Sequence, residues 1–336
     1  MSAPQTLAEI GEDALIGLFE SPGGSLGEHV IVPNGDDAAA YFVEPRYVSV
    51  VTTDTLVEGR HFDLSYGPAF KVGRKLMAVN FSDVAAMGAR PRYALLSLCF
   101  PGSTPVDVAR GIASGVTDMA RTYGVAVIGG NVSGTSGPIT LGATLIGRAE
   151  PSDLVRRRGA QVGDAIFVTG QLGEARAGLQ ILMEGIELEK GDRALSLVSA
   201  QLDPTPRVAA GLALGRHKLA HAMCDVSDGF GQDLRRLLVP EGLGARIEGH
   251  ALPISAALQA FCAAKGLDPV DTALRGGEDY EILFTAHPRD HDGIVQACAA
   301  EGTPVSRVGT VLAEAQFEVV MPDGFVRGLP GGFDHF

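Results

Sequence analysis

Tryptophan is absent from this sequence of 336 residues, and cysteine and basic residues are scarce. The four cysteines form no CxxC pair, which argues against a zinc knuckle and against a disulfide framework. Lysine and arginine number 27 against 40 aspartates and glutamates, so the net charge is −13. A chain this acidic is a poor binder of nucleic acid and of anionic membranes. Because no basic-then-apolar leader and no membrane-length apolar run is present, we expect a cytoplasmic protein with no membrane partner.

Several catalytic motifs are also missing. The sequence has no P-loop, no protein-kinase glycine loop with its lysine, no GxSxG elbow, no HExxH and no dinucleotide fingerprint. It does have carboxylates next to predicted strands, Gly-Gly turns and a few isolated basic groups. Such a set suits polyphosphate chemistry, in which carboxylates hold the Mg²⁺ ions that offset the charge of the phosphates.

Glycine is abundant, at 44 residues, and 46% of the sequence is hydrophobic, which favours an α/β enzyme with many tight turns. The length predicts two domains, and the composition changes over residues 149–159, so we predict domains at 1–150 and 151–336. Three successive arginines, Arg156 to Arg158, stand at this boundary. They fit either a solvated linker or a group from which one arginine reaches back to grip a phosphate. A short helix is expected over 2–19.

Four aspartates in the first domain come from three predicted elements. Asp36 and Asp37 belong to a glycine-containing turn, and Asp54 is expected where a strand over 47–53 ends. Asp83 lies on a helix predicted over 69–87. Any one of these acids is common in a turn or on a helix surface. Together, with few His or Cys nearby, they favour Mg²⁺ or Mn²⁺ over zinc.

The second half repeats the strand-then-turn arrangement. A strand over 222–225 leads into Ser227, which stands between Asp225 and Asp228. The two acids fit either metal ligands or helix caps. Earlier in the chain, a short strand over 125–128 is expected to end at residues 129–131 (GGN), where two glycines allow a ligand to approach the backbone closely.

An ordered set of motifs resembles one family. The segments are 35–38 (GDDA), 52–62 (TTDTLVEGRHF), 80–89 (NFSDVAAMGA), 225–229 (DVSDG), 276–281 (GGEDYE) and 333–336 (FDHF). They span nearly the whole chain and resemble thiamine-monophosphate kinases, of the aminoimidazole ribonucleotide synthetase-like superfamily. The 52–62 run and the terminal DHF distinguish this family from its relatives. One departure is Asn131, where the family often has Asp, since an amide supplies an oxygen but no charge.

The resemblance implies a two-domain α/β fold with mixed sheets, a homodimer in which the N-terminal sheets join, and transfer of phosphate from ATP to thiamine monophosphate with several Mg²⁺ ions. The implied metal ligands are Asp37, Thr52, Thr53, Asp54, Asp83, Asn131, Asp225 and Asp228. The implied ATP contacts are Gly130, Asn131, Arg157 and Ser227. The implied substrate contacts are His61, Glu278 and Phe333.

Alternatives remain at several positions. Thr52 and Thr53 are consecutive in a strand, so their side chains must point to opposite faces. Phe333 fits either a ring that stacks on substrate or an anchor for the C-terminus. For the whole protein, the alternatives are an ATP-dependent synthetase or dehydratase of the same superfamily and a noncatalytic nucleotide-binding protein. The absence of a cysteine before Cys99 and the terminal Phe336 argue against the synthetase or dehydratase.

Overall fold

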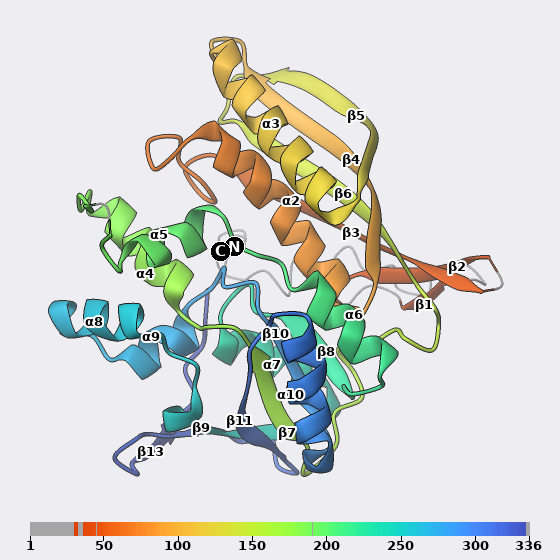
Figure 1. Cartoon of the computed structure of the whole chain (residues 1–336), viewed down its shortest axis with the longest axis vertical. Helices are drawn as coiled ribbons and strands as arrows, with labels where there is room; N and C mark the ends of the chain where they lie inside the picture. Colours follow the sequence, from red (N-terminus) through yellow and green to blue (C-terminus); the bar gives the residue numbers. More distant parts are fainter. Residues whose placement is uncertain (1–29, 33–35, 45, 190, 334–336) are drawn as a thin grey trace, which may run out of the picture.

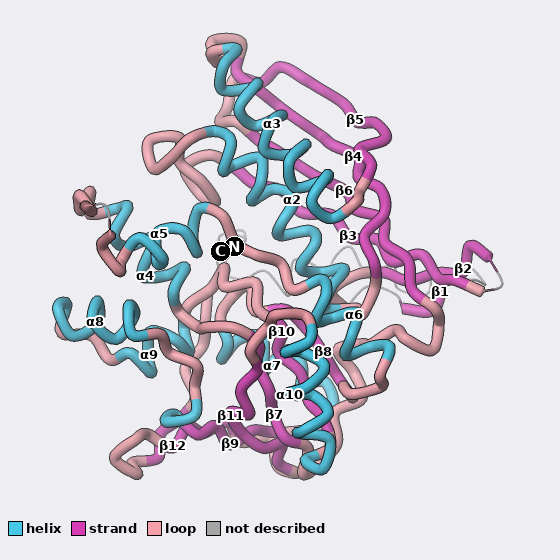
Figure 2. The backbone as a smooth tube through the Cα atoms, viewed as in Figure 1, coloured by secondary structure: helices cyan, strands magenta, loops and turns pink. Residues whose placement is uncertain are grey.

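The computed structural model of the chain describes residues 30–32, 36–44, 46–189 and 191–333. The helix predicted over 2–19, residue 35 of the first motif, and the terminal DHF segment lie outside the described residues. Within that range the chain folds into two mixed sheets with helices packed around them, as Figures 1 and 2 show. The predicted fold class is therefore confirmed.

The first sheet has six strands in the order β1-β2-β3-β6-β4-β5. Their bounds are β1 Val30–Val32, β2 Ala39–Glu44, β3 Tyr47–Val57, β4 Arg90–Pro101, β5 Ala126–Thr135 and β6 Thr140–Ala149. Only β4 and β5 pair in parallel. Helices α2 (Ala69–Ala86) and α3 (Val106–Tyr123) lie against one face of this sheet (Figure 1).

Helix α2 is buried on most of its sides, because it packs against the sheet, against α3 and against the second half of the chain. The helix predicted over 69–87 is thus confirmed almost to the residue. Two glycines bring α2 and α3 close together: a Cβ on Gly73 would lie 2.0 Å from the Ile112 carbonyl oxygen, and one on Gly115 would lie 1.9 Å from that of Phe70. Gly124, at φ 67°, ends α3.

The second sheet has seven strands in the order β13-β12-β9-β11-β7-β10-β8. Their bounds are β7 Ala165–Thr169, β8 Ala222–Asp225, β9 Gly244–Glu248, β10 Ile282–Ala286, β11 Val305–Leu312, β12 Phe317–Val320 and β13 Val326–Gly328. The α-helices of this half are α4 Glu174–Met183, α5 Leu195–Leu202, α6 Val208–Arg216, α7 Phe230–Leu238, α8 Ala256–Lys265, α9 Pro269–Arg275 and α10 His291–Ala300. Figure 1 shows α4, α5, α8 and α9 gathered on one side of this half.

Two predicted strand ends are wrong. Strand β3 continues to Val57, so Asp54 lies inside it, because β6 pairs with β3 along its whole length and extends the hydrogen-bonded ladder. Strand β5 likewise continues through Gly130 to Thr135, because β4 pairs with it as far as Pro101. In both cases a partner strand far along the chain sets the end.

One hydrophobic core cluster includes residues of both halves, such as Leu76 and Phe81 from α2 and Phe167 and Phe284 from the second sheet. The strands of the first sheet end at Ala149 and those of the second begin at Ala165. The division at residue 150 stays a prediction. No helix among the described residues is long and apolar enough to cross a membrane.

Candidate active site

A cavity of about 890 Å³ lies between the two halves of the chain. Strand β3 and helix α2 contribute Asp54 and Asp83, and the loop after β8 contributes Ser227 and Asp228. The segments 277–280 and 331–333 complete the wall. The motifs quoted from the sequence therefore meet in one place, although they are up to about 280 residues apart in the chain.

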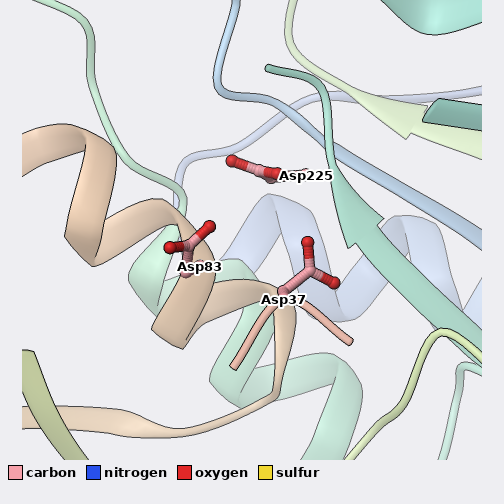
Figure 3. Close-up of side chains that lie close together, drawn as sticks. All are labelled: Asp37, Asp83 and Asp225. Carbon is pink, nitrogen blue, oxygen red and sulfur yellow. The ribbon is translucent and has the colours of Figure 1, made fainter. Parts of the chain in front are cut away.

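Three carboxylates lie close together, as Figure 3 shows, and two of them, Asp83 and Asp225, line the cavity. Asp37 lies just before β2, Asp83 on α2, and Asp225 at the end of β8. One oxygen of each lies within 4.8 Å of the others. Oxygen ligands supplied by three separate elements are the donor set that Mg²⁺ prefers, and this cluster contains no histidine or cysteine. The residues present thus fit a hard divalent cation.

The electrostatics of the cluster are unfavourable without a cation. Burial raises the pKa of Asp83 well above its ordinary value, and the neighbouring Asp54, Asp225 and Asp37 raise it further. Burial and Asp37 likewise raise the pKa of Asp225. Because desolvated like charges disfavour ionisation, a bound cation would relieve both costs at once.

Hydroxyl groups and one arginine hold the three carboxylates in place. Thr52 donates from Oγ1 to Oδ2 of Asp83 at 2.6 Å, and Ser82 donates from Oγ to Oδ2 of Asp225 at 2.7 Å. Arg157 donates two hydrogen bonds to Asp37, from Nε at 3.0 Å and from Nη2 at 2.7 Å. Burial alone would lower the pKa of Arg157, but Asp37 outweighs it and raises that pKa. Of the three successive arginines, Arg157 therefore reaches the acidic cluster.

Asp36 hydrogen-bonds to the main chain of both members of the Arg157–Asp37 pair. It accepts from the backbone N–H groups of Arg157 at 3.0 Å and of Asp37 at 2.9 Å. Burial, followed by repulsion from Asp37, raises the pKa of Asp36 to about 6. Its two backbone partners fix the turn that presents Asp37.

Four of the expected ligands and contacts are not part of the cluster. Thr53 lines the cavity, and its hydroxyl donates to the carbonyl of Ala143, whereas that of Thr52 donates to Asp83. Asp228 pairs with Arg236. Gly130 and Asn131 stand on β5, where Gly130 is in register with Leu96 of β4, Ala143 of β6 and Asp54 of β3. Three strand spacings amount to roughly 14 Å along the sheet.

The loop around Ser227 is organised by a residue that the sequence did not single out. The backbone N–H groups of Ser227, Asp228 and Gly229 all donate to Oδ2 of Asp233, at 3.1, 3.0 and 3.1 Å. These three donors form a nest that already holds an anion, the Asp233 carboxylate. The available signal was weak: an acid in the first turn of a helix that follows a Gly.

The expected substrate contacts line the same cavity, and the backbone N–H groups of Phe333 and Glu278 donate to the carbonyls of Asp228 and Ser227 at 2.8 and 2.7 Å. His61 accepts at Nδ1 from the backbone N–H of Val57 at 3.1 Å. The ring of Phe333 is 44% exposed, and the guanidinium of Arg60 lies over it, 5.4 Å from the ring centroid. A second cavity of about 260 Å³ shares His61, Glu278 and Phe333 with the first.

The carboxylate of Glu278 is held on both sides. Lys75 pairs with Oε1 at 2.7 Å, and Gln201 donates to Oε2 at 2.7 Å. The backbone here is strained, because Glu278 and Tyr280 have φ of 65° and 50°, values that side chains with a Cβ rarely adopt. Between them, Asp279 accepts from the N–H groups of Gly173 at 2.7 Å and Ala175 at 3.3 Å at the start of α4. Sequence reasoning missed Lys75 and Gln201, for which no local motif exists.

Comparisons with known proteins agree with this arrangement. The family models for AIR synthase related proteins match residues 35–149 with the N-terminal domain and 161–322 with the C-terminal domain. A curated thiamine-monophosphate kinase of Rhodopirellula baltica is 36% identical over 315 residues, which cover 89% of this chain and 92% of that protein. The thiamine-monophosphate kinase of Aquifex aeolicus is 39% identical over 288 residues, covering 84% and 88%.

A solved structure, AaThiL complexed with AMPPCP and TMP, superposes with a TM-score of 0.85 at 34% identity and covers all of both chains. With two family models over most of the chain and relatives of this similarity over nearly their full length, the chain belongs to the thiamine-monophosphate kinase family.

Proposed function

We propose that this chain transfers the terminal phosphoryl group of ATP to thiamine monophosphate, giving ADP and thiamine diphosphate. The buried cluster of Asp37, Asp83 and Asp225 beside a large cavity carries the proposal, since a divalent cation would offset the charge that Arg157, Thr52 and Ser82 leave on such a set. The relatives named above carry this activity in their names, and one was solved with AMPPCP, an ATP analogue, and TMP.

Mg²⁺ is the cation that the cluster would hold. Asp37, Asp83 and Asp225 are the primary ligands, and Asp54 and Asp228 line the same cavity and would complete the set. Thr52, Thr53 and Asn131 are further ligands implied by the family resemblance. When bound, Mg²⁺ supplies positive charge that offsets the charge of the phosphates.

The polyphosphate of ATP would lie against the cluster. Arg157 is the nearest cation to these carboxylates on the described part of the chain, and its planar guanidinium suits phosphate oxygens. The Ser227 hydroxyl is available from the loop after β8, whose backbone donors are committed to Asp233. Gly130 and Asn131 are proposed ATP contacts by resemblance, and their distance from Asp54 along the sheet makes them the least supported.

The chemistry proposed is direct in-line transfer without a phosphoenzyme. The attacking oxygen belongs to an anionic phosphate, so the reaction needs no strong general base. His61, Glu278 and Phe333, which line the same cavity, would hold the thiamine moiety.

We also propose a homodimer through the first sheet. Helices α2 and α3 cover one face of it, and large apolar side chains of its strands are exposed: Tyr41, Phe42, Tyr93, Leu95, Val127, Ile128 and Val132. Exposed apolar groups that gather on one sheet mark an interface. Light scattering should give twice the mass of one chain, 34.9 kDa, and Ile128→Lys should lower it. A cytoplasmic location stays a prediction.

Incubation with ATP, MgCl₂ and thiamine monophosphate, followed by chromatography, tests the reaction. We expect thiamine diphosphate and ADP in equal amounts, and none when EDTA exceeds the metal. ATP consumption without thiamine diphosphate would favour a synthetase or dehydratase, and absence of turnover would favour a noncatalytic nucleotide-binding protein.

A further inference from the structure

Lys75 is a buried lysine in a protein of few bases. It lies on α2 and is only 3% exposed, and its Nζ is 2.7 Å from Oε1 of Glu278. The same Nζ donates to the carbonyl oxygen of His61 at 3.3 Å. Burying an ammonium group is costly unless it is paired and hydrogen-bonded. Lys75 meets this requirement with the carboxylate of Glu278 and the carbonyl of His61, which belong to two of the expected substrate contacts.

Gln201 completes the arrangement from α5. Its Nε2 donates to Oε2 of Glu278 at 2.7 Å, so each carboxylate oxygen has its own donor. The Glu278 side chain is nevertheless 26% exposed and lines both cavities. A carboxylate oxygen has two lone pairs, so Glu278 retains acceptor capacity toward a ligand.

The main chain and the side chain of Glu278 are held by different contacts. With φ at 65°, the residue adopts a conformation that persists only where surrounding contacts enforce it. Its N–H donates to the Ser227 carbonyl at 2.7 Å, which holds the main chain but leaves the side-chain torsions unconstrained. Lys75 and Gln201 are the contacts that fix those torsions.

We propose that Lys75 and Gln201 are positioning residues that fix the carboxylate of Glu278 for the thiamine end of the substrate. Lys75 also offsets the charge of Glu278, so the carboxylate serves as an oriented hydrogen-bond acceptor and not as an uncompensated counter-charge. This inference rests on the proposed function. It adds to that function a specificity role for two residues that contact Glu278 and are not among the proposed metal ligands.

Kinetics of four variants test the proposal: Lys75→Met, Gln201→Leu, Glu278→Gln and the double variant Lys75→Met/Glu278→Gln. Loss of a hydrogen bond to a charged group corresponds to about tenfold or more in affinity. We therefore expect Lys75→Met to raise the KM for thiamine monophosphate about tenfold, with the KM for ATP changed less than about twofold. Gln201 likewise donates to the charged carboxylate of Glu278, so Gln201→Leu should raise the same KM by a similar factor.

The double variant separates positioning from a purely structural ion pair. If Lys75 acts through Glu278, Lys75→Met/Glu278→Gln should bind thiamine monophosphate no more weakly than Glu278→Gln alone. Calorimetry with thiamine monophosphate in the absence of ATP gives the same comparison without turnover. Lys265→Met, which removes a surface lysine paired with Glu184, is the matched control and should leave both KM values unchanged.

Additive losses in the double variant, or equal increases in both KM values, would overturn the proposal. So would an unchanged KM for thiamine monophosphate in folded Lys75→Met. If Lys75→Met does not fold, Gln201→Leu decides alone, because it leaves no buried charge unpaired. A wild-type protein that makes no thiamine diphosphate would instead refute the proposed function.

Discussion

The Asp83→Asn variant tests whether Asp83 is a metal ligand or a purely structural carboxylate. The ligand oxygens of Asp37, Asp83 and Asp225 lie within 4.8 Å of one another. At that separation and an effective dielectric constant near 20, two like charges repel by about 3 kcal/mol. Asp83→Asn removes the charge and keeps an oxygen that can accept the hydrogen bond from Thr52. Without metal, the variant should therefore be more stable than the wild type.

The pH dependence has a definite sign. Burial and neighbouring acids raise the pKa of Asp83 in the folded protein above its unfolded value of 3.8. A raised carboxyl pKa means that the folded state holds the proton more tightly, so stability falls as pH rises above about 4. The advantage of Asp83→Asn should thus be larger at pH 8 than at pH 5. Since protonation partly relieves the repulsion, we expect at most about 3 kcal/mol, or several degrees in Tm.

The assay is thermal denaturation without metal and with MgCl₂ at roughly 5–10 mM, a concentration in excess of what a typical site needs. The wild type should gain stability from Mg²⁺, and Asp83→Asn should lose most of that gain together with about two decades of turnover. Asp107→Asn is the control, because Asp107 is an exposed acid on α3 that pairs with Arg110. An Asp83→Asn protein that is less stable without metal and still gains as much from Mg²⁺ would refute the reasoning.

Three further predictions concern single residues. Asp54→Asn should lower turnover by about two decades, and without metal its melting temperature should be no lower than that of the wild type, because Asp54 is a like charge beside Asp83; steady-state assay and calorimetry check both. Burial and Asp228 raise the pKa of Asp233 from 3.8 to about 7, so wild-type stability should fall from pH 4 to 7, and Asp233→Asn should flatten that slope in urea titrations. Phe333→Ala should raise the KM for thiamine monophosphate alone if the ring stacks on substrate; a lowered Tm with both KM values shifted would indicate an anchor.

Local sequence pattern was enough to predict elements whose ends are marked in the chain itself. Strand β8 and helix α2 have apolar runs bounded by Gly, Asp or Pro, and the predicted bounds are confirmed for β8 and, to one residue, for α2. Strand β3 was predicted too short because its last four residues depend on pairing with β6, about 90 residues later. Strand ends that a distant partner sets carry no local signal.

The candidate site likewise contains residues that a local sequence motif identifies and residues that it does not. Asp37, Asp83 and Asp225 stand in recognisable motifs, so sequence identified the acids that the fold brings together. Lys75 and Gln201 do not: a lysine on a helix and a glutamine near a helix end are ordinary surface residues until the fold places both against Glu278. The predicted roles of the individual residues toward metal, ATP and substrate stay predictions.

Helix α2 carries both Lys75, which pairs with Glu278, and Asp83, a member of the acidic cluster. The two residues are eight positions apart, which corresponds to about 12 Å along the helix axis. Under the proposed function, this one buried helix would set the distance between the group that binds the thiamine ring system and the metal ligand beside the phosphate. A monophosphate whose ring and phosphate are separated by a shorter or longer linker would be out of register at one end, however well each group fits its own subsite.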